Sequence, residues 1–247
     1  MTPLTLIGID CATDPRKVGL ACGTIEADRL SVRHACRGTA DNARTIVDWI
    51  DESEWSLLAL DAPLGWPRAL SRALSGHQAG RPVGGDPNLL FRRITDRIIE
   101  SEIGKRPLDV GADRIARTAH AALALLQQVR ALAGAAIPLA WSPNTAARIA
   151  AIEVYPAATL TACGLRSSGY KRPEQKGERR EILKGLKPQL TLPAAARRSA
   201  RSNADVLDAV ICCLAAADFV RGDVVQPFDI ELSRSEGWIW ARRPTNR

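Results

Sequence analysis

The segment Leu4-Thr-Leu-Ile-Gly-Ile-Asp10 is a nearly continuous apolar run that ends in a carboxylate. Such a run is typical of a central strand that is buried on both faces. After a turn at residues 11–15, the short run Lys17-Val-Gly-Leu-Ala-Cys22 indicates a hairpin partner. A carboxylate at the tip of a buried strand costs free energy unless a metal ion, a cation or amide donors compensate it. The alternative is that Asp10 only opens the turn, a position where aspartate is common.

A second strand that ends in an aspartate follows at Trp55-Ser-Leu-Leu-Ala-Leu-Asp61. Between the two, residues 29–36 alternate as a strand does, and residues 41–51 have the spacing of a helix. Three strands, a helix and a fourth strand predict a meander followed by a crossover, in which the first and fourth strands lie parallel and adjacent. Asp10 and Asp61 would then share the sheet edge at which α/β proteins bind ligands.

Two later segments add further carboxylates. Ala150-Ala-Ile-Glu153-Val-Tyr-Pro156 is a fifth short apolar run, and its proline places Glu153 near the end of the strand. Residues 202–217 predict a helix in which Asp205 and Asp208, three positions apart, share one face. The helix macrodipole favours an acid near the N-terminus on the solvent side, but it does not explain Asp208, which stands among apolar residues.

Residues 66–140 differ in composition from the strands around them. Glycine and proline interrupt the first part, and the second part has the composition and spacing of an Ala/Leu-rich helix. We expect an inserted loop and helical subregion within one domain that spans residues 1–247. Arg92, Arg93 or Arg97 in this subregion could bind an anion, although a surface helix with ordinary ion pairs is the simpler interpretation.

The composition limits the class of protein. A chain of 247 residues that is 46% hydrophobic can bury a sizeable core. No stretch approaches the roughly 18 to 20 apolar residues of a membrane span, and we expect no secretory signal and no membrane partner. The six cysteines form no C-x-x-C pair and the three histidines are scattered, which argues against structural zinc and fits a reducing cytoplasm.

The net charge of +7 is concentrated in one segment. Residues 162–202 hold eleven Lys and Arg, among them Lys171 and Arg172, and three Glu, so the rest of the chain is close to neutral. A localised basic block is typical of a protein that binds a polyanion, and we expect a nucleic acid as the partner. The alternative is a solvated loop that binds nothing.

The acids suggest a chemistry if they converge. Carboxylates that lie close together repel one another and need a hard cation to neutralise them, which predicts Mg²⁺ or Mn²⁺. Two such ions about 4 Å apart can align a water molecule and a leaving oxygen on a phosphodiester. The candidate ligands and catalytic groups are the five strand-end and helix acids, Asp10, Asp61, Glu153, Asp205 and Asp208.

The chain resembles known proteins in the order and spacing of short motifs. The strand-end acids and Asp205-Val-Leu-Asp208-Ala resemble the ribonuclease H superfamily, and its Holliday-junction resolvase branch most closely. More of the chain is similar to the domain of unknown function 429 family, described as predicted nucleases of that fold. The motifs that carry this second resemblance are Gly8-Ile-Asp10, Leu60-Asp-Ala-Pro-Leu-Gly65, Arg93-Ile-Thr-Asp96-Arg97, Ile152-Glu-Val-Tyr-Pro156, Asp205-Val-Leu-Asp208-Ala and Glu236-Gly-Trp-Ile239.

The resemblance implies a ribonuclease H-like α/β fold, with a mixed five-stranded sheet flanked by helices and a large, mainly helical insertion. By position, Asp10, Asp61 and Asp208 would bind the metal, with either Asp205 or Glu153 completing the site. A junction resolvase would be a symmetric homodimer. About ninety residues separate Asp61 from Glu153, and an insertion of that size could cover the site and restrict it to a small substrate.

The function expected from these observations is a divalent-metal-dependent nuclease that cleaves DNA or RNA. Arg93, Asp96, Arg97, Lys171 and Arg172 would contact the substrate. One alternative is a nucleotide-binding phosphotransferase of the actin and sugar-kinase type, but the chain has no G-x-x-x-x-G-K-[ST] loop. The other is a non-catalytic protein that binds nucleic acid.

Overall fold

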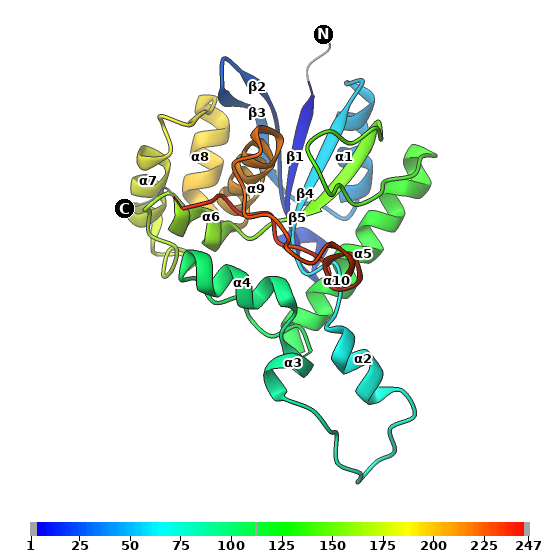
Figure 1. The fold of residues 1–247 in the computed structure, drawn as a ribbon. Coiled ribbons are helices and arrows are strands. Elements are labelled where there is room, and N and C mark those ends of the chain that lie inside the picture. Colours follow the sequence, from blue (N-terminus) through cyan, green and yellow to red (C-terminus); the bar gives the residue numbers. More distant parts are fainter. Residues whose placement is uncertain (1–3, 112, 245–247) are drawn as a thin grey trace.

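Six strands form one mixed sheet in the order β5-β4-β1-β2-β3-β6, with helices on both faces (Figure 1). The computed structural model describes residues 4–111 and 113–244. The α/β class and the mixed sheet are as predicted, but the count of five strands is wrong. The sixth, β6, has two residues and pairs with β3 from within the basic segment, where no alternation of apolar residues signals a strand. The strands are β1 (Thr5–Asp10), β2 (Gly19–Glu26), β3 (Arg29–Arg37), β4 (Ser56–Asp61), β5 (Ile149–Glu153) and β6 (Leu190–Thr191).

The central strand β1 has the neighbours that the sequence predicts. It pairs antiparallel with β2 and parallel with β4, and the parallel register places Asp10 directly opposite Asp61. β5 continues the parallel part of the sheet, with Glu153 opposite Leu60. The carboxyl ends of β1, β4 and β5 therefore meet at one edge of the sheet, which faces α4 and α10 in Figure 1.

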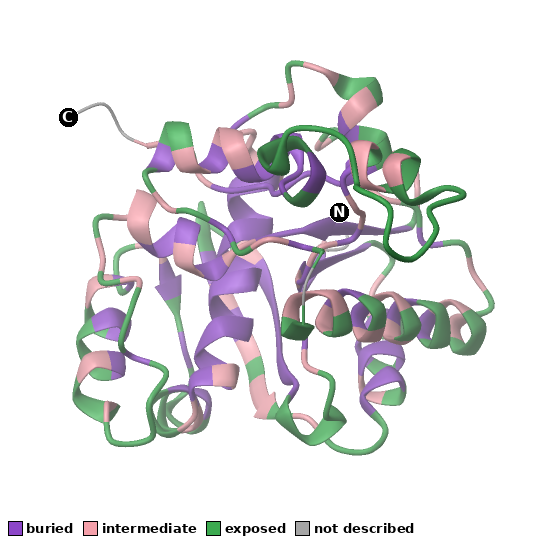
Figure 2. Ribbon diagram, turned by 90° about the horizontal axis from the view of Figure 1, so that it is seen from below, coloured by how far each residue is buried: buried purple, intermediate pink, exposed green. Residues whose placement is uncertain are grey.

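Each face of the sheet contributes to a separate apolar core because side chains alternate along the strands. Leu6 lies in the core beneath α6, α7, α8 and α9, whereas Ile7 and Ile9 lie in the core beneath α1 and α5. Figure 2 shows the buried strands at the centre and the exposed residues on the outer helices. The helices of these two layers are α6 (Pro156–Ala162), α7 (Lys176–Gly185), α8 (Ala194–Ser202), α9 (Ala204–Arg221), α1 (Asn42–Asp51) and α5 (Asp113–Ala133).

The helix α9 packs directly on the sheet because two glycines leave room for its backbone. A Cβ atom at Gly8 would lie 2.0 Å from the Ala209 carbonyl oxygen, and one at Gly19 would lie 1.9 Å from the Asp205 carbonyl oxygen. The side chain of Asn203 caps the helix. Its Oδ1 accepts hydrogen bonds from the backbone amides of Asp205 and Val206 at 2.7 and 3.2 Å. This close approach brings Asp208 to the tips of β1 and β4.

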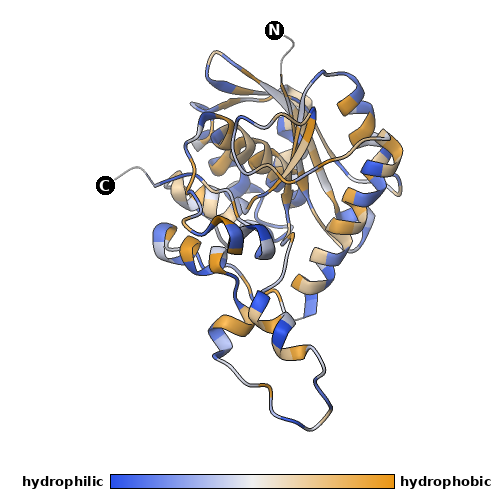
Figure 3. Cartoon of the chain, turned by 45° about the vertical axis from the view of Figure 1, so that its right-hand side comes forward, coloured by the Kyte–Doolittle hydropathy of each residue, from blue (hydrophilic) through white to orange (hydrophobic). Residues whose placement is uncertain are grey.

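The described residues between β4 and β5 form four helices. The last of them, α5, packs on the sheet beside α1, so it belongs to a flanking layer. The connection between α2 and α3 extends away from the body of the protein, with hydrophobic residues on the short helices at its base (Figures 1 and 3). The elements of this segment before α5 are α2 (Arg68–Leu74), α3 (Pro87–Phe91) and α4 (Ile94–Ile103).

The C-terminal part of the chain returns to the sheet. After α10 (Ile230–Glu236), Trp238 and Trp240 are buried, and the backbone amide of Trp240 donates to the carbonyl oxygen of Glu153 at 2.9 Å. A short 3₁₀ turn, η1 (Pro15–Lys17), connects β1 to β2. Among the described residues, no helix combines the length and the apolar character that crossing a membrane requires.

Candidate metal centre

Three of the predicted acids meet at the carboxyl edge of the sheet. Asp10 ends β1, Asp61 ends β4, and Asp208 projects from the second turn of α9. Each offers one carboxylate oxygen, and these oxygens all lie within 4.8 Å of one another. The three come from separate parts of the chain, so the fold itself holds the carboxylates together.

This arrangement is electrostatically unfavourable without a cation. Burial raises the pKa of Asp10 well above its usual range, and the charges of Asp208 and Asp61 raise it further. Burial also raises the pKa of Asp61 to about 7, where the Lys171 ammonium opposes the shift and Asp208 adds to it. Protein sites that hold hard divalent cations have this character, because the ion restores the charge balance.

The carboxylate of Asp208 is fully buried and has two partners. Its Oδ1 accepts a hydrogen bond from the Tyr170 hydroxyl at 2.7 Å. Its Oδ2 has the Lys171 ammonium, 2.5 Å away, as its one partner in the described parts of the chain. Lys171, predicted to contact substrate, therefore lies at the acids and supplies a positive charge there. Tyr170 was not predicted, because nothing in its sequence surroundings distinguishes it from a core tyrosine.

A buried arginine fixes the loop that carries Tyr170 and Lys171. Arg179 of α7 is 1% exposed, and its guanidinium donates to the carbonyl oxygens of Tyr170, Arg172 and Arg201 at 2.5, 2.8 and 2.8 Å. In the sequence it is one of several cations in the basic segment. In the structure it joins the loop to the end of α8.

Glu153, the third strand-end acid, is engaged by an arginine. Arg93 donates to both carboxylate oxygens, with Nη2 to Oε1 at 2.7 Å and Nη1 to Oε2 at 2.8 Å. The backbone amide of Leu64 donates to Oε2 as well, at 2.9 Å. Burial raises the pKa of Glu153, and the Arg93 charge and hydrogen bonds oppose that shift. Glu153 is not one of the three acids whose oxygens converge.

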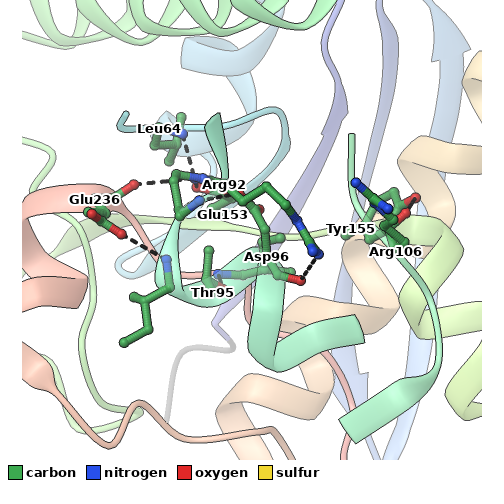
Figure 4. A network of polar contacts seen from close by, with 11 residues as sticks. Leu64, Arg92, Thr95, Asp96, Arg106, Glu153, Tyr155 and Glu236 are labelled. Carbon is green, nitrogen blue, oxygen red and sulfur yellow. Dashed lines mark hydrogen bonds and ion pairs between the residues drawn. The ribbon is translucent and has the colours of Figure 1, made fainter. Parts of the chain in front are cut away.

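The prediction of a surface helix around Arg93 is wrong, because this residue is 1% exposed and lies in a buried network at the start of α4. Figure 4 shows this network, with Asp96, Glu153 and Glu236 labelled. Asp96 is equally buried and binds the Arg93 guanidinium at 2.9 and 3.2 Å. Glu236 accepts from the backbone amides of Arg68 and Ile94, both at 2.8 Å. The acids on both sides of the guanidinium balance its charge, so it can be buried. The network connects α4, β5 and α10 behind the three acids.

The remaining predicted residues lie outside the three-acid group. Asp205 is half-buried in the first turn of α9, and burial raises its pKa, with the Asp208 charge adding to the shift. Arg97 is half-buried on α4, and Arg172 is exposed in the loop that Arg179 fixes. Their predicted substrate contacts stay predictions.

A cavity of about 430 Å³ opens beside Asp10 and Asp61. The connection from α4 to α5 and the first turns of α5 form one wall, and residues after β5 and before α7 form another. Among these wall residues, the sequence predicts a substrate contact for Lys171 alone. The walls are formed by Lys105, Pro107, Leu108, Ile115, Thr118, Tyr155, Ser167 and Lys171.

The raised pKa of Asp61 predicts a pH-dependent stability of the metal-free protein. Between the usual carboxyl pKa near 4 and the folded value of about 7, the folded state binds more protons than the unfolded chain. The free energy of unfolding therefore falls as the pH rises through that interval. In EDTA, we expect the Tm of the wild type, relative to Asp61→Asn, to fall by about 5 °C between pH 5 and pH 8. Parallel Tm curves for the two proteins would contradict this.

The family model described as "Protein of unknown function (DUF429)" matches residues 8–231, nearly the whole chain. The matched range includes Asp10, Asp61, Glu153 and Asp208. No curated protein matches the chain.

Proposed function

The chain belongs to the family described as protein of unknown function DUF429, and from this premise we propose that it is a divalent-metal-dependent nuclease that hydrolyses phosphodiester bonds in DNA or RNA. The observation that carries the proposal is the convergence of Asp10, Asp61 and Asp208, whose oxygens lie within 4.8 Å of one another. A buried set of carboxylate oxygens suits Mg²⁺ or Mn²⁺ better than the softer metals.

The topology supports a ribonuclease H-like fold. β1, β4 and β5 run parallel, β2 lies antiparallel beside β1, and β3 continues that hairpin. In this arrangement the acids of β1 and β4 lie side by side and α9 adds its own acid from one face. The helices α2, α3 and α4 are then the insertion, and α5 is a flanking helix of the sheet.

The contacts of the Asp208 carboxylate also suit a bound cation. Oδ2 of Asp208 is buried and has only the partly exposed Lys171 side chain as its partner among the described residues. Tyr170 holds the other oxygen of Asp208, which fixes the plane of the carboxylate. A bound Mg²⁺ or Mn²⁺ would lower the pKa of a water molecule and stabilise negative charge on a phosphate. Asp10, Asp61 and Asp208 would hold it, and the Lys171 ammonium would then be available to the phosphate.

The structure favours Asp205 over Glu153 as the fourth acid. Both oxygens of Glu153 are held by Arg93, and one also accepts from the Leu64 amide. Asp205 lies one turn before Asp208 on α9, and its charge contributes to the raised pKa of Asp10. We assign Asp205 to the outer part of the metal site and Glu153 to positioning the chain around it.

Nucleic acid would bind along the basic helices. A groove of about 500 Å³ lies between α7 and α8, and α8 ends three residues before Asp205. Phosphate contacts of this kind orient a nucleic acid without reading its sequence. The residues that line the groove are Arg180, Glu181, Leu183, Lys184, Lys187, Arg197, Arg198 and Arg201.

A cleavage assay tests the proposal. The purified protein is incubated with labelled branched, duplex and single-stranded DNA and RNA in Mg²⁺, in Mn²⁺ or in EDTA. We expect cleavage of at least one substrate that requires the metal and that weakens steeply as salt is raised, since the basic groove binds phosphates. If no substrate is cleaved in either metal, the nuclease proposal is wrong.

A further inference from the structure

We propose that the cavity beside the three acids takes a single unstacked nucleotide, so that the substrate is single-stranded nucleic acid or a frayed end and not a continuous duplex. This inference rests on the proposed nuclease function and specifies its substrate.

The size of the cavity supports one nucleotide. Its volume is about 430 Å³, and cavities of roughly 300 to 1,000 Å³ are typical of sites for drug-sized ligands, a class that includes a nucleotide. The wall formed between α4 and α5 stands beside the acids. A phosphate at Asp10 and Asp61 would place its neighbouring base in the space between the walls. The bases of a continuous duplex remain stacked inside the helix and cannot enter that space.

The chemistry of the cavity changes from one side to the other, as that of a nucleotide does. The acids and Lys171 form the charged side, while Pro107, Leu108 and Ile115 contribute an apolar side. Leu108 is 67% exposed, although it lies beside a cluster of carboxylates. An exposed apolar side chain in such a place gains free energy when the flat face of a base covers it.

Tyr155 provides an aromatic surface in the same cavity. The side chain is half-buried, and its hydroxyl lies 3.5 Å from the carbonyl oxygen of Arg106, which belongs to the opposite wall. Bases stack on aromatic rings in many proteins that bind single strands, without a requirement for sequence. Tyr155 follows β5 by two residues, so the ring is held close to the acids.

Two lysines stand around the cavity to meet phosphates. The Lys171 ammonium contacts Asp208, and the Lys105 ammonium lies 3.4 Å from the carbonyl oxygen of Ser167. An ammonium group has three protons, so Lys105 can donate to a phosphate while keeping its contact with Ser167. Lys171 becomes available to a phosphate when a cation takes its place at Asp208. The cavity thus offers an apolar face for a base between cations for the phosphates on either side.

The test measures binding without cleavage. A short fluorescein-labelled single strand and a blunt duplex of the same sequence are titrated with protein in Ca²⁺ at about 0.15 M salt, followed by fluorescence anisotropy. We expect the single strand to bind about tenfold more tightly. Leu108→Gln should weaken binding of the single strand roughly fivefold or more, and Ile115→Trp, which fills the cavity, should weaken it further.

The control is Leu132→Gln, the same change at an exposed position on α5 about 25 Å from Ile115. This variant should bind the single strand as the wild type does. Equal affinity for the two probes overturns the inference, and so does an unchanged affinity in Leu108→Gln. If cleavage requires the metal but is unchanged in Leu108→Gln, the nuclease proposal holds and the nucleotide pocket is wrong. If binding depends on Leu108 but no substrate is cleaved, the nucleotide pocket holds and the nuclease proposal is wrong.

Discussion

Asp10→Asn is expected to abolish Mn²⁺ binding and to lower nuclease activity by at least about a hundredfold, while the metal-free protein becomes more stable. The amide removes one charge from three closely spaced acids that repel one another, so the free energy of unfolding rises in EDTA. It also removes an anionic oxygen that a divalent cation requires. Isothermal titration calorimetry measures the binding, and thermal unfolding in EDTA measures the stability. A loss of binding in a stabilised protein cannot be attributed to misfolding.

Two further variants separate this effect from a general change in charge. Asp51→Asn removes an exposed carboxylate at the end of α1, and we expect its metal binding to equal that of the wild type. Lys171→Met should act in the opposite direction to Asp10→Asn and tighten Mn²⁺ binding about tenfold, because the ammonium competes with the cation for Asp208. If Asp10→Asn binds Mn²⁺ as well as the wild type does, the three acids are not a metal site.

The convergence of the acids could be predicted because it follows from regular structure. The apolar runs identify β1 and β4, and the order of elements makes these two strands parallel neighbours. Once they are aligned, Asp10 must face Asp61, as the register confirms. Asp208 could be singled out because an acid among apolar residues on a helix needs a partner in the core. Local patterns and one rule of topology predict the meeting of Asp10 and Asp61, and the family resemblance adds Asp208 to them.

The environment of Glu153 could not be predicted in the same way. Its partner Arg93 lies sixty residues earlier in the sequence, and a charged residue beside apolar ones predicts a surface helix when its partner is unknown. The same limit applies to Arg179. The sequence does not distinguish it from the other cations of the basic segment, but it is buried and donates hydrogen bonds to the carbonyl oxygens of a loop and a helix end. Irregular connections decide both contacts, and these connections carry little periodicity.

The cavity walls show a related limit. Tyr155 follows a predicted strand and could be placed near the acids, but Leu108 lies in a connection that has no regular structure. The sequence predicts that an insertion of this length could cover the site, and one side of the cavity is lined by Lys105, Pro107, Leu108, Ile115 and Thr118. Which side chains form that wall depends on how α4 and α5 pack, and α4 is fixed by the buried network around Arg93.

Arg93→Met is expected to destabilise the protein by about 3 to 5 kcal/mol, the largest loss of stability that we expect from a single substitution here. The guanidinium is 1% exposed and binds Glu153 and Asp96, so its removal leaves two carboxylates buried without a cation. Urea unfolding at pH 7.5 measures the loss, and the Tm should fall by roughly 10 °C. The stability of Arg93→Lys should lie between that of the wild type and that of Arg93→Met, because a lysine keeps the charge but cannot bind both carboxylates in the same plane.

The pH dependence of this loss identifies its cause. Burial raises the pKa of Glu153, and Arg93 opposes that shift, so without the arginine this pKa rises further. A carboxyl whose folded pKa is raised lowers the free energy of unfolding progressively as the pH rises from its unfolded pKa near 4 to its folded pKa, so the deficit should shrink towards pH 5. Arg93→Met combined with Glu153→Gln should be more stable than Arg93→Met alone. The control Arg114→Met removes a side chain that is 93% exposed and should stay within about 0.5 kcal/mol of the wild type. If Arg93→Met is as stable as this control, the buried network does not hold α4 against β5.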